Sequence, residues 1–250
     1  MSGLGSIILE GFPKQRDDLY RIYRRLKYDV FVVECGWDSL GDESGDTIAK
    51  EDPFDECGRF WLARTSDGLP IGVIRGNRLQ DGFPHRELLK HHLPQFHHET
   101  ALQTTCTLNA LAVLPDYRSR LCHVPARGWH GTVARLLLLA IIRSLEAEGQ
   151  RAAIATCSGL RSIRLCVDSG FAVIDRPART AIHDSLLTNI GMVFESPAHV
   201  EAQRACGIEP LVDGSARDGT RTLQAYFAER HRMALDSKPL ESYFSDYIST

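Results

Sequence analysis

The feature that most constrains the fold of this chain is a strand, a basic loop, a long helix and a second strand in its middle. Residues 105–114 alternate apolar and polar side chains as a half-buried strand does, and Pro115 ends the run. Residues 132–148 repeat apolar side chains at helical spacing, and residues 152–156 are typical of a buried strand. Two strands joined by a crossover helix pair in parallel, so this segment predicts a locally parallel α/β sheet.

The flanking segments predict a mixed sheet. Residues 60–63 and 71–79 are strand-like runs joined by a Ser-Asp-Gly turn, which predicts an antiparallel hairpin. Further strands are expected at residues 6–9, 171–174 and 190–194, helices near residues 17–30, 160–169 and 222–233, and an irregular helical excursion over residues 80–103. The first helix should place its arginines and lysine on the face opposite its apolar residues. This order predicts a three-layer α/β/α sandwich. We expect one domain over residues 1–200, with a C-terminal extension, residues 201–250, that packs one helix on the same domain.

Composition excludes several classes of protein. The 250 residues carry a net charge of −3 with both signs interspersed, so no basic face for nucleic acid is expected. Seven cysteines without a Cys-x-x-Cys pair argue against a disulfide framework or a zinc ribbon and favour a reducing cytosol. The histidines at 91, 92, 97 and 98 have no metal-site spacing, so no metal is expected. No signal peptide is evident, and the longest apolar run, residues 136–142, is far short of the roughly 20 residues of a membrane span. We expect a soluble cytoplasmic protein.

A basic, glycine-containing segment lies between the central strand and the long helix. Its candidate binding residues are Val113, Arg118, Arg120, Arg127, Gly128 and Gly131. Backbone amides at a helix N-terminus bind phosphate well, and arginines add charge-assisted hydrogen bonds. The arrangement resembles the acyl-donor segment of the GNAT acyltransferase superfamily, which implies a donor bearing pantetheine, either an acyl-carrier protein or a coenzyme A thioester. A solvated basic loop before a core helix is the alternative interpretation.

A second resemblance begins nearer the N-terminus. Lys27 precedes Val30-Phe31, Gly36-Trp37 follows, and Asp52 and Asp55 enclose Phe54 before the hairpin. Together with an arginine on the second hairpin strand, this pattern resembles the acyl-homoserine-lactone synthases over residues 19–115. The resemblance implies transfer of a fatty acyl group from an acyl thioester to the amine of S-adenosyl-methionine, which yields a quorum-sensing signal. It implies no tightly bound cofactor.

The resemblance also implies roles for individual residues. The catalytic candidates are Asp52, Asp55 and Thr107, and the substrate-binding candidates are Lys27, Phe31, Trp37, Arg75, Arg78 and Asn109. An aromatic face attracts a sulfonium or ammonium cation, although Phe31 is equally well explained as a core residue. The two aspartates can bind an α-amino group, or they can belong to an acidic surface loop. One of the two arginines is expected to tie this acidic loop to the sheet through a bidentate pair.

The chain departs from the family at four positions. Lys27 stands where the family has its first arginine, and Thr107-Leu108-Asn109-Ala110 stands where it has Glu-Leu-Ser-Arg. The glutamate proposed to activate water is therefore missing, together with the second arginine. An N-acyl amino acid synthase and a non-catalytic GNAT-like sensor remain as alternatives, although the retained Trp37, Asp52 and Asp55 favour an enzyme. No Cys-His-Asp arrangement supports a covalent intermediate, so direct transfer is expected, with the thioester between residues 105–114 and 152–156.

Overall fold

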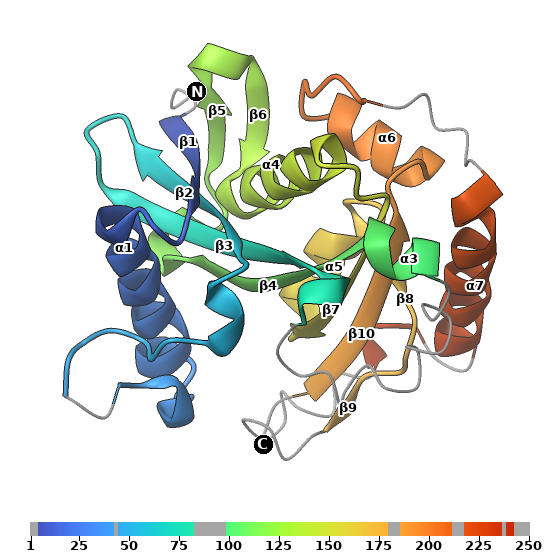
Figure 1. Ribbon diagram of the computed structural model, residues 1–250, viewed down its shortest axis with the longest axis horizontal. Coiled ribbons are helices and arrows are strands. Elements are labelled where there is room, and N and C mark those ends of the chain that lie inside the picture. The colour runs from blue at the N-terminus through green and yellow to red at the C-terminus, as the bar shows by residue number, and fades with distance from the viewer. Residues whose placement is uncertain are drawn as a thin grey trace. The chain divides into compact units, whose positions relative to one another are not determined.

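The computed structural model describes residues 5–42, 45–82, 99–179, 186–211, 218–236 and 239–242 (Figure 1). Its strands are β1 Gly5–Pro13, β2 Arg59–Thr65, β3 Pro70–Arg78, β4 Thr105–Val113, β5 Leu121–Val124, β6 Trp129–Thr132, β7 Ala152–Ser158, β8 Ala172–Val173, β9 Ala178–Arg179 and β10 Leu186–Val193. Its α-helices are α1 Asp17–Lys27, α3 Glu99–Thr104, α4 Val133–Ala147, α5 Leu160–Val167, α6 Pro197–Arg204 and α7 Asp218–Leu235. Within these residues, no helix has both the length and the apolar character needed to cross a membrane.

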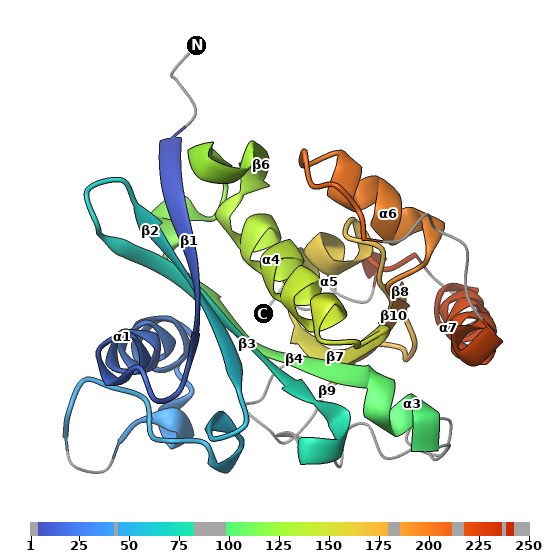
Figure 2. The same ribbon diagram turned by 45° about the horizontal axis from the view of Figure 1, so that its top comes forward.

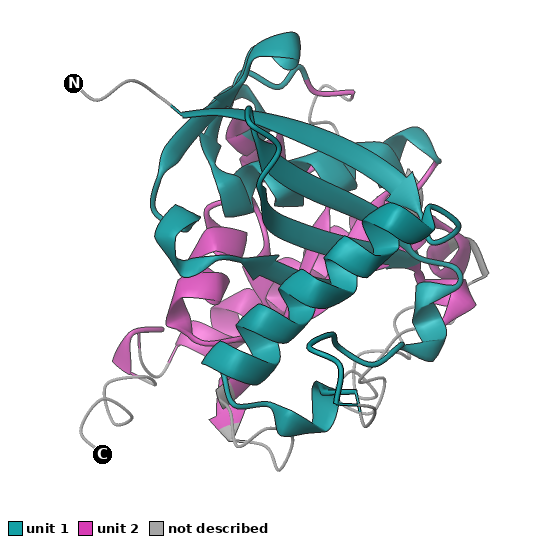
Figure 3. Ribbon diagram, turned by 90° about the vertical axis from the view of Figure 1, so that its left-hand side faces the viewer, with its two compact units in different colours: residues 1–77, 108–148, 203–209 teal, residues 78–107, 149–202, 210–250 magenta. Residues whose placement is uncertain are grey.

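The fold consists of two compact units (Figure 3). The first contains residues 1–77, 108–148 and 203–209, and the second contains residues 78–107, 149–202 and 210–250. Strand β4 begins in the second unit and continues into the first.

The first unit is built on the strand order β6-β5-β1-β2-β3-β4. Strands β1, β2 and β3 are antiparallel neighbours, whereas β5 pairs in parallel with β1 and antiparallel with β6. The hairpin between β2 and β3 turns at Gly68, whose φ of 92° suits glycine because it has no Cβ. The predicted antiparallel hairpin is confirmed.

Helices cover both faces of this sheet, and Figure 2 shows α1 and α4 on opposite sides of β1 to β3. Val73 belongs to the hydrophobic cluster formed with the buried face of α1. Gly72 and Gly76 have the opposite parity on β3. A Cβ at either glycine would approach side chains of α4 to 3.0 Å or less, so their small size allows the helix to pack closely. The predicted mixed sheet flanked by helices is confirmed.

The second unit has the strand order β4-β7-β10-β8, with β9 beside β10. Thr105 to Thr107 of β4 pair in parallel with β7, as the crossover pattern predicted, and β10 runs antiparallel to β7. Helix α7 packs on β10, where a Cβ at Gly191 would lie 2.4 Å from the ring of Phe227. Buried Glu195 holds α7 further, because it accepts hydrogen bonds from Thr220 and from Arg151.

Three details differ from the expectations. The basic segment before α4 is a β-hairpin, β5–β6, because Cys122, Val124 and Trp129 turn inward and Gly128 supplies a left-handed turn residue. The first helix ends as an α-helix at Lys27 and continues as a π-helix, Tyr28–Glu34. The helix expected in the C-terminal extension is α7, and α6 precedes it. The boundary of a domain at residue 200 stays a prediction.

His199 on α6 generates a prediction about stability. Its side chain is fully buried, with Nδ1 2.9 Å from the carbonyl oxygen of Ser169, and burial lowers the pKa of His199 from 6.5 to about 4. Below pH 6.5 the unfolded chain therefore binds a proton that the folded chain excludes until pH approaches 4. The free energy of unfolding should fall by ~2 kcal/mol between pH 7.5 and pH 5 from this group alone.

The measurement is urea unfolding at both pH values. In His199→Asn, whose amide can still donate to Ser169, this part of the pH dependence should disappear. The exposed His130→Asn serves as the control and should behave as the wild type does. An unchanged pH dependence in His199→Asn would refute the assignment.

Candidate active site

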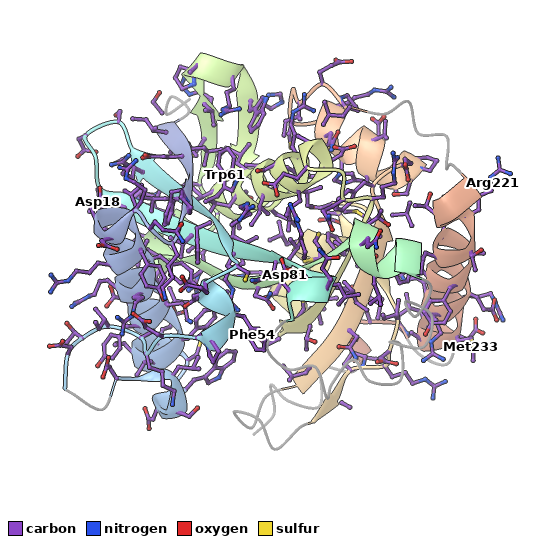
Figure 4. All side chains as sticks on the ribbon, in the orientation of Figure 1. Asp18, Phe54, Trp61, Asp81, Arg221 and Met233 are labelled. Carbon is purple, nitrogen blue, oxygen red and sulfur yellow. The ribbon has the colours of Figure 1, made fainter. Side chains whose placement is uncertain are left out.

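The acidic loop folds into a single 3₁₀ turn, Pro53–Asp55, that caps its own N-terminus. Asp52 Oδ1 accepts a hydrogen bond of 2.9 Å from the amide of Phe54, and Asp55 Oδ2 accepts one of 3.1 Å from the amide of Asp52. This reciprocal pattern satisfies two amides that a helix end would otherwise leave free, and proline fits the first position. Both carboxylates are therefore fixed in direction. Figure 4 labels Phe54, which lies between them in this turn.

Arg75 on β3 clamps this turn to the sheet. Its guanidinium, 1% exposed, donates 3.0 Å to Asp52 Oδ2 and also donates to Asp55 Oδ1. Asp55 is completely buried, and its Oδ2 accepts a further hydrogen bond of 2.7 Å from the hydroxyl of Tyr20. Asn77 completes the attachment by donating 2.7 Å to the carbonyl oxygen of Phe54.

The electrostatics of this cluster keep Asp55 ionised. Burial by itself raises the pKa of Asp55, but the charges of Arg75 and Lys27 and the Tyr20 hydrogen bond outweigh it, so the pKa of Asp55 is lowered. Removing the guanidinium would leave an uncompensated charge in the interior, which is costly. Arg75 and Asp55 therefore depend on each other.

Strand parity decides between the two candidate arginines. Val73, Arg75 and Asn77 share one face of β3 because side chains alternate along a strand, and this is the face that α1 covers. Arg78 has the opposite parity and lies in the second unit. Arg75 is thus the arginine that ties the acidic loop to the sheet.

The aromatic candidates stack on each other. The rings of Phe31 and Trp37 lie 5.1 Å apart between centroids with an interplanar angle of 5°, and the Trp37 amide donates 2.9 Å to the Phe31 carbonyl. The wide π-helical turn that contains Phe31 includes a hydrogen bond from the amide of Cys35 to the carbonyl of Val30, five residues back. Both rings are half-buried, and Phe31 also packs against the hydrophobic cluster beneath α1. Phe31 therefore has a core contact as well as a ring face stacked on Trp37.

Lys27, the last residue of α1, is 5% exposed, and its Nζ lies 5.4 Å from the centroid of the Tyr23 ring. On a helix, residues four apart share a face, so Lys27 and Phe31 are neighbours across the junction with the π-helix. Burial is the main cause that lowers the pKa of Lys27.

The candidates on β4 lie in different units. Thr107 is buried in the second unit, whereas Asn109 is half-buried in the first. The next residue, Ala110, has a φ of 53°, and among the described residues it is the one non-glycine with a positive φ. This left-handed conformation interrupts the extended strand, and such outliers collect at functional sites. The sequence carries no signal for it, because alanine fits an ordinary strand.

The donor candidates do not converge. Arg118 donates from Nε to the carbonyl oxygen of Val113, 2.8 Å away. Its two NH groups form a bidentate ion pair with the carboxylate of Glu34. Arg120 stacks on Tyr117 at 4.8 Å.

The remaining donor candidates belong to the hairpin. The Arg127 guanidinium lies 4.9 Å from the Trp129 ring and 5.5 Å from the Trp61 ring. Gly128 turns the hairpin, and Gly131 lies on β6 just before Thr132, which caps α4. Gly131 is therefore the candidate placed nearest in sequence to the first turn of α4.

Metal binding has no support in the described ranges, which contain no cluster of three or more histidine, cysteine, aspartate or glutamate side chains. The histidines at 91, 92, 97 and 98 lie outside the described residues.

Comparison with known proteins gives a structural match without a close sequence relative. No protein-family model matches the chain, and no curated protein sequence matches it significantly. A solved structure of BjaI, a CoA-dependent acyl-homoserine lactone synthase with SAM and isopentyl-CoA, is 16% identical with a TM-score of 0.61, covering 88% of this chain and 98% of that one. TofI in a ternary complex with an inhibitor and MTA is 15% identical with a TM-score of 0.59, covering 82% and 98%. The acyl-homoserine lactone synthase LasI is 14% identical with a TM-score of 0.57, covering 85% and 100%. The chain thus has the fold of these synthases.

The Arg75 cluster generates a prediction about stability. Arg75→Met should lower the free energy of unfolding by roughly 3–5 kcal/mol, because it strands the buried Asp55 carboxylate. Asp55→Asn should also lower the free energy of unfolding, because it leaves the buried Arg75 guanidinium with one charged partner fewer. Arg59→Met on the neighbouring strand breaks the exposed pair with Glu148 and should cost less than about 1 kcal/mol. Chemical denaturation of the three variants is the measurement, and equal losses in Arg75→Met and Arg59→Met would contradict the prediction.

Proposed function

We propose that this protein is an N-acyltransferase that moves a fatty acyl group from an acyl thioester to the amine of S-adenosyl-methionine, giving an acyl-homoserine lactone. The observation that carries the proposal is the stacked Phe31–Trp37 pair, joined through the first helix to the buried Asp52–Arg75–Asp55 cluster within one unit. The substrates named for the structural neighbours support it, since BjaI was solved with SAM and an acyl-CoA, and TofI with MTA. An aromatic face and fixed carboxylates within the same unit suit a substrate with both a sulfonium and an ammonium group.

The two aspartates have different roles in this proposal. The Asp52 side chain is 19% exposed, whereas that of Asp55 is fully buried. Asp52 is therefore the carboxylate that contacts the substrate amine. Asp55 holds Arg75 and the 3₁₀ turn in place from the interior. It is therefore a positioning residue that does not touch the substrate.

Acyl transfer also requires a polarised thioester carbonyl. The left-handed conformation of Ala110 turns the peptide groups on either side of it away from the regular strand direction. Ala110 packs at the edge of the same hydrophobic cluster as Phe31. We assign the polarising amides to this bend, where they can donate to the carbonyl oxygen.

The donor is an acyl-carrier protein or a coenzyme A thioester. Its phosphate-bearing arm is assigned to the segment from Val113 to Gly131 and to the first turn of α4, where backbone amides and the helix dipole favour negative charge. We propose one acyltransferase domain over residues 1–200. We also propose that the enzyme is active in a reducing cytoplasm, with which its seven free cysteines are consistent.

Incubating the purified chain with acyl-CoA or acyl-carrier protein, with and without S-adenosyl-methionine, tests the proposal by mass spectrometry. Trp37→Ala should lower kcat/KM for S-adenosyl-methionine roughly 3- to 30-fold through loss of the cation–π contact, whereas Trp37→Phe should retain most of it. Acylation of free amino acids with no effect of S-adenosyl-methionine would identify an N-acyl amino acid synthase instead. Absence of thioester consumption would identify a non-catalytic relative.

The donor assignment makes a separate prediction. Arg120→Ala should raise KM for the thioester several-fold, most clearly at low salt, because exposed charge contacts weaken with screening. Arg118→Ala should act less directly, since Arg118 is already paired with Glu34. Arg16→Ala removes an exposed arginine elsewhere in the first unit and is the matched control. An unchanged KM in Arg120→Ala would contradict the assignment of the segment from Val113 to Gly131 to the donor.

A further inference from the structure

Lys27 is a buried amine whose placement the proposed function has not yet used. Its residue is 5% exposed, and its Nζ faces the Tyr23 ring. Within the part of the chain that the structure describes, no oxygen accepts a hydrogen bond from it and no carboxylate pairs with it. Lysines seldom occupy such positions, because burying an ammonium is costly.

The neighbouring carboxylates are already occupied. Asp55 Oδ1 and Asp52 Oδ2 accept from the Arg75 guanidinium, and the other two carboxylate oxygens accept from the Tyr20 hydroxyl and from backbone amides. Every carboxylate oxygen thus has a hydrogen-bond donor without Lys27. The two carboxylates and Arg75 still leave one negative charge, so Lys27 interacts with this cluster through charge at a distance and not through a hydrogen bond.

The charged groups around Lys27 act in both directions. Burial lowers its pKa most, Asp55 and Asp52 raise it, and Arg75 and Arg24 lower it again, with a net lowering. A lysine whose pKa is lowered gives up its proton more readily than an exposed lysine, and its amine then accepts a proton, a role that buried lysines take in enzymes. Position agrees with such a role, since Phe31 of the stacked pair lies one helical turn further along the same face.

We propose that Lys27 is the base that removes a proton from the substrate ammonium before acyl transfer, an assignment that rests on the proposed function. The Lys27 amine takes one proton and becomes an ammonium, which leaves a neutral substrate amine. The amine nitrogen forms the C–N bond to the thioester carbonyl carbon, the C–S bond breaks, and the second proton of that nitrogen goes to the departing thiolate. Lys27 then returns its proton to water.

The other ionisable groups of the cluster are poorer bases. Asp55 is locked to Arg75 with a lowered pKa, and Asp52 is engaged by the same guanidinium. Thr107, at the position of the family's glutamate, carries a hydroxyl that is not basic at neutral pH. Lysine at position 27 also differs from the family's arginine in the one property that matters here, because arginine does not lose its proton in proteins.

The test compares Lys27→Arg with Lys14→Arg, whose lysine is paired with Glu51 and Glu56 at the surface. Lys27→Arg should lower kcat roughly 100-fold or more with little change in KM for S-adenosyl-methionine, and should remove the rise of kcat with pH. Lys14→Arg should match the wild type. Lys27→Met, with a thermal midpoint measured beside its kcat, separates loss of the base from loss of the fold.

A second readout does not need turnover. Reductive methylation with ¹³C-formaldehyde labels the lysines, five in this chain, and the resonance missing in Lys27→Arg belongs to Lys27. It should titrate at a lower pH than the Lys14 resonance. A wild type that forms no acyl amide overturns the proposed function and this role with it. Normal wild-type turnover with an unaffected Lys27→Arg, or a Lys27 that titrates together with Lys14, overturns the Lys27 assignment alone.

Discussion

The buried contact between Arg75 and the two aspartates is the interaction on which the site depends. It joins a strand, a one-turn helix and, through Tyr20, the first helix of the chain. An ion pair of this kind is expensive to desolvate, and the cost is offset only where further hydrogen bonds hold the partners in good geometry. Here the partners are fixed by backbone geometry, because the 3₁₀ turn caps itself with the same carboxylates. The cluster therefore holds the acidic turn rigidly in place and sets the electrostatic surroundings of Lys27.

The residues of the site differ in how far they are buried, and this difference separates their roles. Asp55 and Arg75 have almost no exposed surface, so their influence on a substrate is exerted through position and field. Asp52, Trp37 and Phe31 retain exposed area and are the groups that a ligand can touch. Substitutions in the two sets should therefore separate into those that affect folding first and those that affect binding first.

Periodic segments were predictable from the sequence, whereas features that depend on tertiary packing were not. Helix α4 and the parallel pairing of β4 with β7 were predictable, because the apolar side chains of these segments repeat at regular helical and strand spacing. The β5–β6 hairpin was missed because its four-residue strands, interrupted by proline and glycine, resemble a basic loop. Lys27 was expected on the polar face of its helix, but it is buried because it shares a helix face with the buried Tyr20 and Tyr23. Nothing local in the sequence distinguishes Ala110 from any other strand residue.

The hairpin before α4 has a mechanical consequence. Thr132 ends β6 and also caps α4, accepting a hydrogen bond from the amide of Arg135. At its other end the hairpin is paired with the first strand of the chain through β5. Because two rigid elements share a single residue with no linker between them, a displacement of the hairpin cannot be absorbed before it reaches the helix. Any contact that tilts β5 and β6 would therefore also move the first turn of α4 and the backbone amides at that end of the helix.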